Sequence, residues 1–98
     1  MTRRIPLPHP GEVLREEFLE PMGLSVYALA KAIGAPRSRI NGICRREQGV
    51  TASIALRLGK FFGVDARWFM NMQTQYDLQV EAARLADKIA AIAPRRAA

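Results

Sequence analysis

Residues 24–46 read LSVYALAKAIGAPRSRINGICRR, and this stretch decides the fold. Ser25 is a good N-cap for a first helix, whose apolar residues then recur at three- and four-residue spacing and form one buried face. Gly34 supplies the left-handed conformation at which such a helix commonly ends. Pro36 suits the first turn of a second helix, because its missing N–H costs nothing there. Two short helices joined by so tight a corner predict a helix-turn-helix.

The second helix of this motif has two different faces. Ile40 and Ile43 mark its core side. At about 100° per residue, the opposite side holds Ser38, Asn41, Gly42 and Arg45, flanked by Arg37 and Arg39. We expect this outward face to contact DNA, with Gly42 letting the backbone come close.

The basic residues are concentrated around this helix. Between Lys31 and Lys60 there are seven basic residues and one acid, Glu47, which leaves +6, while eight basic and eight acidic residues elsewhere cancel. A basic face is more often merely solvated than bound to nucleic acid. Together with the helix-turn-helix, however, this distribution favours a protein that neutralises DNA phosphates.

Length and composition limit the alternatives. A chain of 98 residues, of which 49% are apolar, predicts one domain with one small core and no large enclosed substrate cavity. Because no apolar run approaches the roughly twenty residues of a membrane span, we expect a cytoplasmic protein without membrane contact. Cys44 is the only cysteine, which excludes an internal disulfide, and we interpret it as structural.

The rest of the chain is predicted to be helical as well. A first helix covers residues 12–20, Thr51 caps a helix that Gly63 closes, and Asp65 caps a longer one that runs to about residue 80. Residues 82–93 either prolong that helix or form another. This pattern predicts an all-α fold with a flexible basic arm (residues 1–9), a helix-turn-helix domain (10–80) and a helical C-terminal extension and tail (81–98).

Catalysis finds little support in the sequence. His9 is the only histidine, and it precedes a proline in an arm that we expect to be mobile, where it is best explained as a turn or cap residue. The glutamates of the first helix would lack a pocket. We therefore expect no enzymatic activity, no cofactor and no metal.

Two further surfaces are candidates for protein contacts. Leu85 and Ile89 belong to an apolar stripe that a five-helix domain would leave without an internal partner, so we expect it to mediate oligomer contact, unless it is a frayed tail. The first helix carries the only concentrated acidic surface, formed by Glu12, Glu16, Glu17 and Glu20 and opposed only by Arg15. These glutamates either attract a basic partner or only make the helix soluble.

Four blocks of the sequence resemble the HigA/VapI family of antitoxins. They are HPGEVLREEFL (residues 9–19), LSVYALAKAIG (24–34), GVTASIALRLGKFFG (49–63) and WFMNMQTQYDL (68–78). The helix-turn-helix alone would fit any XRE-type regulator, whereas the first and last blocks discriminate more. The resemblance implies a five-helix phage-repressor-like domain that forms a homodimer, binds a palindromic operator in its own promoter and neutralises a RelE-like ribonuclease toxin.

The resemblance also implies residue roles. Base contacts fall on the recognition helix, at Arg37, Ser38, Asn41 and Arg45, and DNA backbone contacts on Lys31, Arg39 and Arg46. An Arg can pair with guanine and an Asn with adenine in the major groove. Because a ribonuclease must be basic to hold RNA, the acidic first helix is the candidate toxin contact. The alternatives are a stand-alone XRE-type repressor without a toxin and, less favoured, a pure protein-interaction module.

Overall fold

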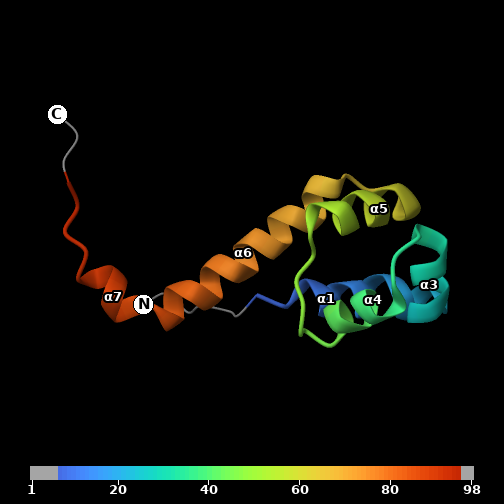
Figure 1. Cartoon of the computed structure of the whole chain (residues 1–98), viewed down its shortest axis with the longest axis horizontal. Coiled ribbons are helices and arrows are strands. Elements are labelled where there is room, and N and C mark those ends of the chain that lie inside the picture. Colours follow the sequence, from blue (N-terminus) through green and yellow to red (C-terminus); the bar gives the residue numbers. More distant parts are fainter. Residues whose placement is uncertain (1–6, 96–98) are drawn as a thin grey trace.

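The computed structural model describes residues 7–95, and all of their regular structure is helical (Figure 1). The chain forms, in order, α1 (Pro10–Val13), η1 (Leu14–Leu19), α2 (Glu20–Met22), α3 (Val26–Ile33), α4 (Arg37–Cys44), α5 (Ala52–Phe62), α6 (Ala66–Arg84) and α7 (Ala86–Ala90). The all-α expectation is thus confirmed. The beginning of the expected arm (1–6) and the end of the expected tail (96–98) lie outside the described residues.

The first three elements run on as one helix over residues 10–22, whose central part, η1, is a π-helix. The N–H of Glu20 accordingly donates to the carbonyl of Arg15, five residues back. The sequence predicts this helix over residues 12–20, with Pro21 and Gly23 ending it. The helix continues through Pro21 to Met22, and Gly23 ends it with a left-handed φ of 61°. Pro21 lacks an N–H, and its ring would clash with the carbonyl four residues earlier in an ideal α-helix. The wider π-turn before it relieves that clash.

The helix-turn-helix forms as predicted, with one small difference. The Oγ of Ser25 accepts the N–H of Ala28 at 3.0 Å and so caps α3, which Gly34 ends with a φ of 70°. Pro36 is the N-cap of α4 rather than its first helical residue. Its ψ of 139° explains the difference, because this extended conformation lies outside the helix.

The later caps also agree with the sequence. The Thr51 Oγ1 accepts the Ile54 N–H at 3.4 Å, and an Asp65 Oδ1 accepts the Arg67 N–H at 2.8 Å. Gly63, with a φ of 72°, closes α5. Short-range side-chain chemistry therefore defines where α5 and α6 begin.

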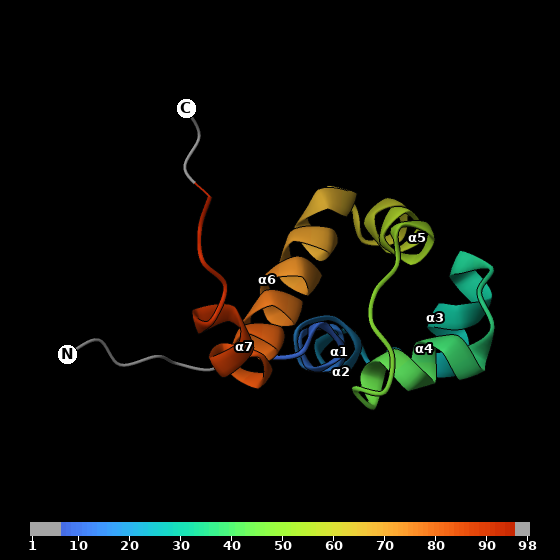
Figure 2. The same ribbon diagram turned by 60° about the vertical axis from the view of Figure 1, so that its left-hand side comes forward.

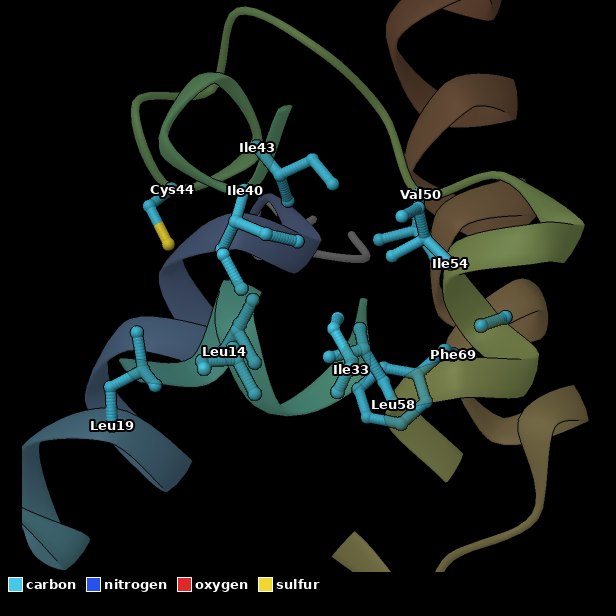
Figure 3. Close-up of a cluster of buried hydrophobic side chains, with 13 residues drawn as sticks. Leu14, Leu19, Ile33, Ile40, Ile43, Cys44, Val50, Ile54, Leu58 and Phe69 are labelled. Atoms are coloured by element: carbon cyan, nitrogen blue, oxygen red, sulfur yellow. The ribbon is translucent and has the colours of Figure 1, made fainter. Parts of the chain in front are cut away.

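Side chains from five helices meet in one core (Figure 3). The side chains that are almost fully buried include Leu14, Leu29, Ile40, Ile43, Leu58 and Phe69. The core side of α4 thus faces inward and leaves the opposite side for a ligand. Cys44 is buried in the same cluster, and its burial raises the pKa of the thiol, which agrees with a structural role.

The spacing of Trp68, Phe69, Met72, Tyr76 and Val80 predicts an apolar stripe along one side of α6, and this prediction is only partly correct. Phe69 is buried, but Trp68 and Val80 are 45% and 42% exposed. A polar side chain, Gln73, is buried instead: its Oε1 accepts the Val50 N–H at 2.7 Å and its Nε2 donates to Asp77 at 2.8 Å. Two hydrogen bonds compensate for the burial of the amide, and no periodicity of apolar residues could indicate them.

His9 is part of the folded domain rather than of a mobile arm. Its Nδ1 accepts the Gly11 N–H at 2.9 Å and caps the first helix, and its ring packs against Tyr76 at a centroid distance of 4.9 Å. Burial lowers the pKa of His9, so the neutral ring that can accept this bond is favoured. The prediction of a cap residue is confirmed, and the expected mobility at His9 is wrong.

The C-terminal helices extend away from the helix-turn-helix (Figures 1 and 2). The helix α6 continues to Arg84, so the expected boundary between residues 80 and 81 falls inside it. Leu85, with a φ of −104° and a ψ of 14°, separates it from α7. Among the described helices, none is long and apolar enough to cross a membrane.

Candidate nucleic-acid interface

The position of α4 depends on a close approach to two other helices. Ala30 on α3 is buried at the corner of the motif, where its small side chain leaves room for the crossing. On the other side, an ideal Cβ at Gly11 would lie 1.7 Å from the carbonyl oxygen of Ile43. Small residues on both sides therefore hold α4 in place.

The outward face of α4 carries the predicted base contacts. Arg37, Ser38 and Arg45 are exposed, and Asn41 is half-buried. The Arg37 guanidinium carbon lies 5.9 Å from the centre of the Tyr27 ring on α3, within cation–π range. All four predicted side chains thus belong to one short helix and its C-cap.

The expectation that Gly42 exposes the backbone of α4 is wrong. Gly42 is buried, and the side chain of Gln48 covers it. An ideal Cβ at Gly42 would lie 2.6 Å from the Nε2 of Gln48. The cause is the loop after α4, which folds back over the helix.

A groove of about 460 Å³ lies between the beginnings of α4 and α5. It is lined by Pro36, Ser38, Arg39, Gln48, Thr51, Ser53 and Ile54. Pro36 has no side chain that could cap α4. The first N–H groups of this helix therefore have no hydrogen-bond acceptor within it. Two helix N-termini beside one groove, with a guanidinium in its wall, favour an anion such as a phosphate.

Arg39 is the cation in the wall of this groove. It is half-buried, and its Nε is a buried nitrogen that makes no hydrogen bond among the described residues. A buried donor without a partner is costly. A phosphate at the groove would give this guanidinium an acceptor, which agrees with the backbone contact predicted for Arg39.

The other basic residues around α4 differ in their surroundings. Lys31 is exposed in the last turn of α3. Arg46, a non-glycine residue with a φ of 65°, binds Glu12 through a 2.7 Å contact between Nη1 and Oε1. Arg57 donates to the carbonyl of Ile33 at 2.8 Å and so caps α3. Part of the positive charge around α4 therefore stabilises the fold.

We expected Arg15 to be the only basic residue that opposes the acidic first helix, and this expectation is wrong. Glu12 is half-buried, and Arg46 from the loop after α4 neutralises it. Glu16, Glu17 and Glu20 are exposed, and Arg15 contacts the first at 3.3 Å and the last at 4.0 Å. The pair with Glu12 joins residues 34 positions apart, which no local pattern reveals.

The remaining predicted residues lie far from the groove. Leu85 is half-buried at the junction of α6 and α7, and Ile89 is 49% exposed. No group of three or more His, Cys, Asp or Glu side chains that could hold a metal occurs in residues 7–95.

Three residues that line the groove, Gln48, Thr51 and Ser53, were absent from the predicted contacts. Thr51 was recognised only as a helix cap. Since an N-cap marks a helix N-terminus, and helix N-termini bind phosphates, the cap itself was a usable signal. For Gln48 no local signal exists, because its place depends on how the loop folds.

Comparison with known proteins decides the family. A family model described as helix-turn-helix matches residues 16–69. Virulence-associated protein I of Dichelobacter nodosus is 58% identical over 76 residues, which cover 78% of this chain and 70% of the relative. This chain belongs to the HigA/VapI family of helix-turn-helix antitoxins. Antitoxin HigA-1 of Vibrio cholerae is 38% identical over 78 residues, which cover 79% of this chain and 71% of that protein.

Solved structures of HigA-type antitoxins are similar over almost the whole chain. The antitoxin HigA of Pseudomonas aeruginosa, solved with the higBA promoter, has a TM-score of 0.88 at 37% identity and covers 92% of this chain and 99% of its own. The antitoxin GraA in complex with its operator has a TM-score of 0.89 at 37% identity, with coverages of 100% and 99%. This HigA/VapI family member thus has the fold of DNA-binding antitoxins, which are not a class of enzymes.

Proposed function

We propose that this chain is the antitoxin of a HigBA-type toxin–antitoxin module. In this role it represses its own promoter by binding a palindromic operator, and it neutralises a RelE-like ribonuclease toxin. The observation that carries the DNA-binding part is the groove between the beginnings of α4 and α5, beside the polar outward face of α4. The promoter complex of Pseudomonas aeruginosa HigA and the operator complex of GraA support it.

The geometry suggests how the work is divided between phosphates and bases. A phosphate placed at the groove meets the N-termini of α4 and α5 together with Arg39. The outward side chains of α4 then point into the major groove, where Arg45 can pair with guanine and Asn41 with adenine. Phosphate contacts set the register, and base contacts provide the specificity.

We expect Asn41→Ala or Arg45→Ala to weaken binding to the protein's own promoter by about 1–3 kcal/mol, the usual worth of a base contact. Arg39→Ala should instead weaken binding to all duplexes alike, because it contacts phosphate. The measurement is a competition assay with a duplex from the promoter upstream of the gene and a random duplex of equal length. Arg15→Ala on η1 is the matched control for the lost charge, because this exposed arginine lies on another helix than the DNA-reading face.

Equal losses on both duplexes for Asn41→Ala would argue against base reading by this residue. If the wild-type protein does not prefer its promoter over the random duplex, the proposed repressor role itself is wrong.

We also propose a homodimer that forms through the end of α6 and through α7. This region projects from the body (Figure 2). It exposes apolar side chains, among them Leu78 at 66% and Ile89 at 49%. A two-fold dimer can place two recognition helices about 34–36 Å apart, one turn of DNA. Light scattering at micromolar concentration, with and without promoter DNA, should give twice the monomer mass. A strictly monomeric protein in both samples would rule the dimer out.

The proposed toxin contact uses the exposed part of the acidic first helix. Glu16, Glu17 and Glu20 remain exposed, whereas Arg46 already neutralises Glu12. A basic ribonuclease would be attracted to this surface, which lies on another helix than the DNA-reading face of α4. Toxin and operator could therefore be held at the same time.

The second candidate function is a stand-alone repressor without a toxin. It is supported by one relative, an HTH-type transcriptional regulator of Haemophilus influenzae with 35% identity.

Reversal of Glu16 and Glu20 to lysine should slow toxin association at least about tenfold at low salt and spare DNA binding. The toxin is produced from the neighbouring gene, and stopped-flow kinetics give the rate. Reversal of Glu81 and Asp87 to lysine is the matched control, because it changes the net charge equally on α6 and α7. If only the control slows association, the toxin binds the C-terminal stripe around Leu85 and Ile89. If the neighbouring gene product does not bind at all, the stand-alone repressor is favoured.

A further inference from the structure

We infer that Gln48, in the loop after α4, reads a base pair in place of a side chain at position 42 of the recognition helix. This inference rests on the proposed DNA binding. It adds a specificity residue that lies outside the helix-turn-helix and that the recognition-helix pattern does not contain.

The first observation is the position of Gly42 on α4. Along a helix with 3.6 residues per turn, Gly42 lies about 200° from Ile40, a fully buried residue of the core side. It therefore lies on the outward half of α4, between Ser38 and Arg39 in angle. A side chain at this position would project beside Ser38, a predicted base contact, but glycine provides none.

The second observation is that Gln48 fills this place. An ideal Cβ at Gly42 would meet three atoms of that one side chain: Nε2 at 2.6 Å, Cδ at 2.9 Å and Cγ at 3.2 Å. The same side chain lines the groove beside Ser38 and Arg39. Gln48 thus brings an amide from the loop onto the outward face of α4, beside Ser38.

The loop backbone fixes this arrangement. The N–H groups of Glu47 and Gln48 both donate to the carbonyl of Gly42, at 2.9 and 3.2 Å. Arg46 adopts its left-handed φ of 65° at the start of the same turn and is held by Glu12. The turn that ends α4 therefore returns the chain over Gly42 in one defined register.

The chemistry of the exposed amide fits base reading. Gln48 is exposed, and among residues 7–95 no hydrogen bond occupies its side-chain amide. A glutamine amide offers a donor and an acceptor side by side, which match N7 and the N6 amino group of adenine in the major groove. An aliphatic or basic side chain at this place would not make that pair.

The test is selection of bound duplexes from a random DNA pool by the full chain, followed by affinity measurements on the best selected duplex. For Gln48→Ala we expect base preference to disappear at one position per half-site and affinity to fall about 5- to 150-fold, which is the worth of one bidentate pair. Affinity for random DNA should stay within about twofold, because Arg39 and the N-termini of α4 and α5, which are assigned to phosphate, remain. Gln75→Ala, an exposed glutamine on α6, is the matched control.

Gly42→Ala provides an independent variant. Its Cβ needs the space of the Gln48 amide, which is the end of a flexible side chain and can move aside. Alanine also favours the helix more than glycine does, so unfolding cannot explain lost affinity. We expect base preference to disappear at the same position as for Gln48→Ala. The double variant should bind the selected duplex no more weakly than either single variant.

The outcomes separate the inference from the function on which it rests. If the wild-type protein selects a motif and Gln48→Ala selects the same motif with unchanged affinity, Gln48 reads no base. The inference is then wrong, but the proposed DNA binding stands. If the wild-type protein selects no motif, sequence-specific DNA binding fails, and the role of Gln48 fails with it.

Discussion

Gly11→Ala is expected to destabilise the protein by about 3 kcal/mol or more, because it forces α1 away from α4. An ideal Cβ at Gly11 would lie 1.7 Å from the carbonyl oxygen of Ile43 and 2.6 Å from its carbonyl carbon. Both are backbone atoms, which cannot rotate away as a side chain would. Alanine is itself a better helix former than glycine, so the loss arises from this clash alone.

The measurement is urea unfolding followed by circular dichroism at 222 nm. Gly63→Ala is the matched control, since Gly63 has a φ of 72° and nothing within 4 Å of its ideal Cβ. There the left-handed backbone alone should cost about 1–2 kcal/mol. If Gly11→Ala costs no more than Gly63→Ala, the two helices do not approach as closely as described. A displaced α4 should also weaken promoter binding.

Gln73→Ala is expected to cost about 2–3 kcal/mol, because it leaves the buried N–H of Val50 without an acceptor. Val50 directly precedes Thr51, the cap of α5, which lines the groove beside α4. The loop between α4 and α5 should therefore loosen. We expect weaker binding to promoter and random duplexes alike, because the groove is assigned to phosphate.

Gln79→Ala controls for this variant. Gln79 lies on the same helix and accepts the Leu7 N–H at 2.8 Å, but this bond is exposed to solvent. Its loss should cost less than about 0.5 kcal/mol, because water replaces the acceptor. Urea unfolding of both variants, with hydrogen exchange at the Val50 amide, checks the prediction. Similar free energies of unfolding for both would contradict the structural role of Gln73.

Much of the fold was predictable because it depends on neighbours in the sequence. Ser25, Thr51 and Asp65 cap helices through bonds to N–H groups two or three residues away, so residue type and position suffice to locate them. Gly34 and Gly63 end helices through a backbone conformation that other residues rarely adopt. The apolar spacing of α4 likewise determines which side faces the core, and hence which side is left for a ligand.

The sequence by itself determined which segments are helical, where α3 and α5 end and which face of α4 is buried, because these follow from contacts within about one helical turn. Only the tertiary structure decided what surrounds that helix. The bond from Val50 to Gln73, the pair of Arg46 with Glu12 and the cap that Arg57 places on α3 join residues 23, 34 and 24 positions apart. Gln48 covers Gly42 only because the turn after α4 folds back. Such contacts depend on the packing of whole elements, which no local pattern of residue types specifies.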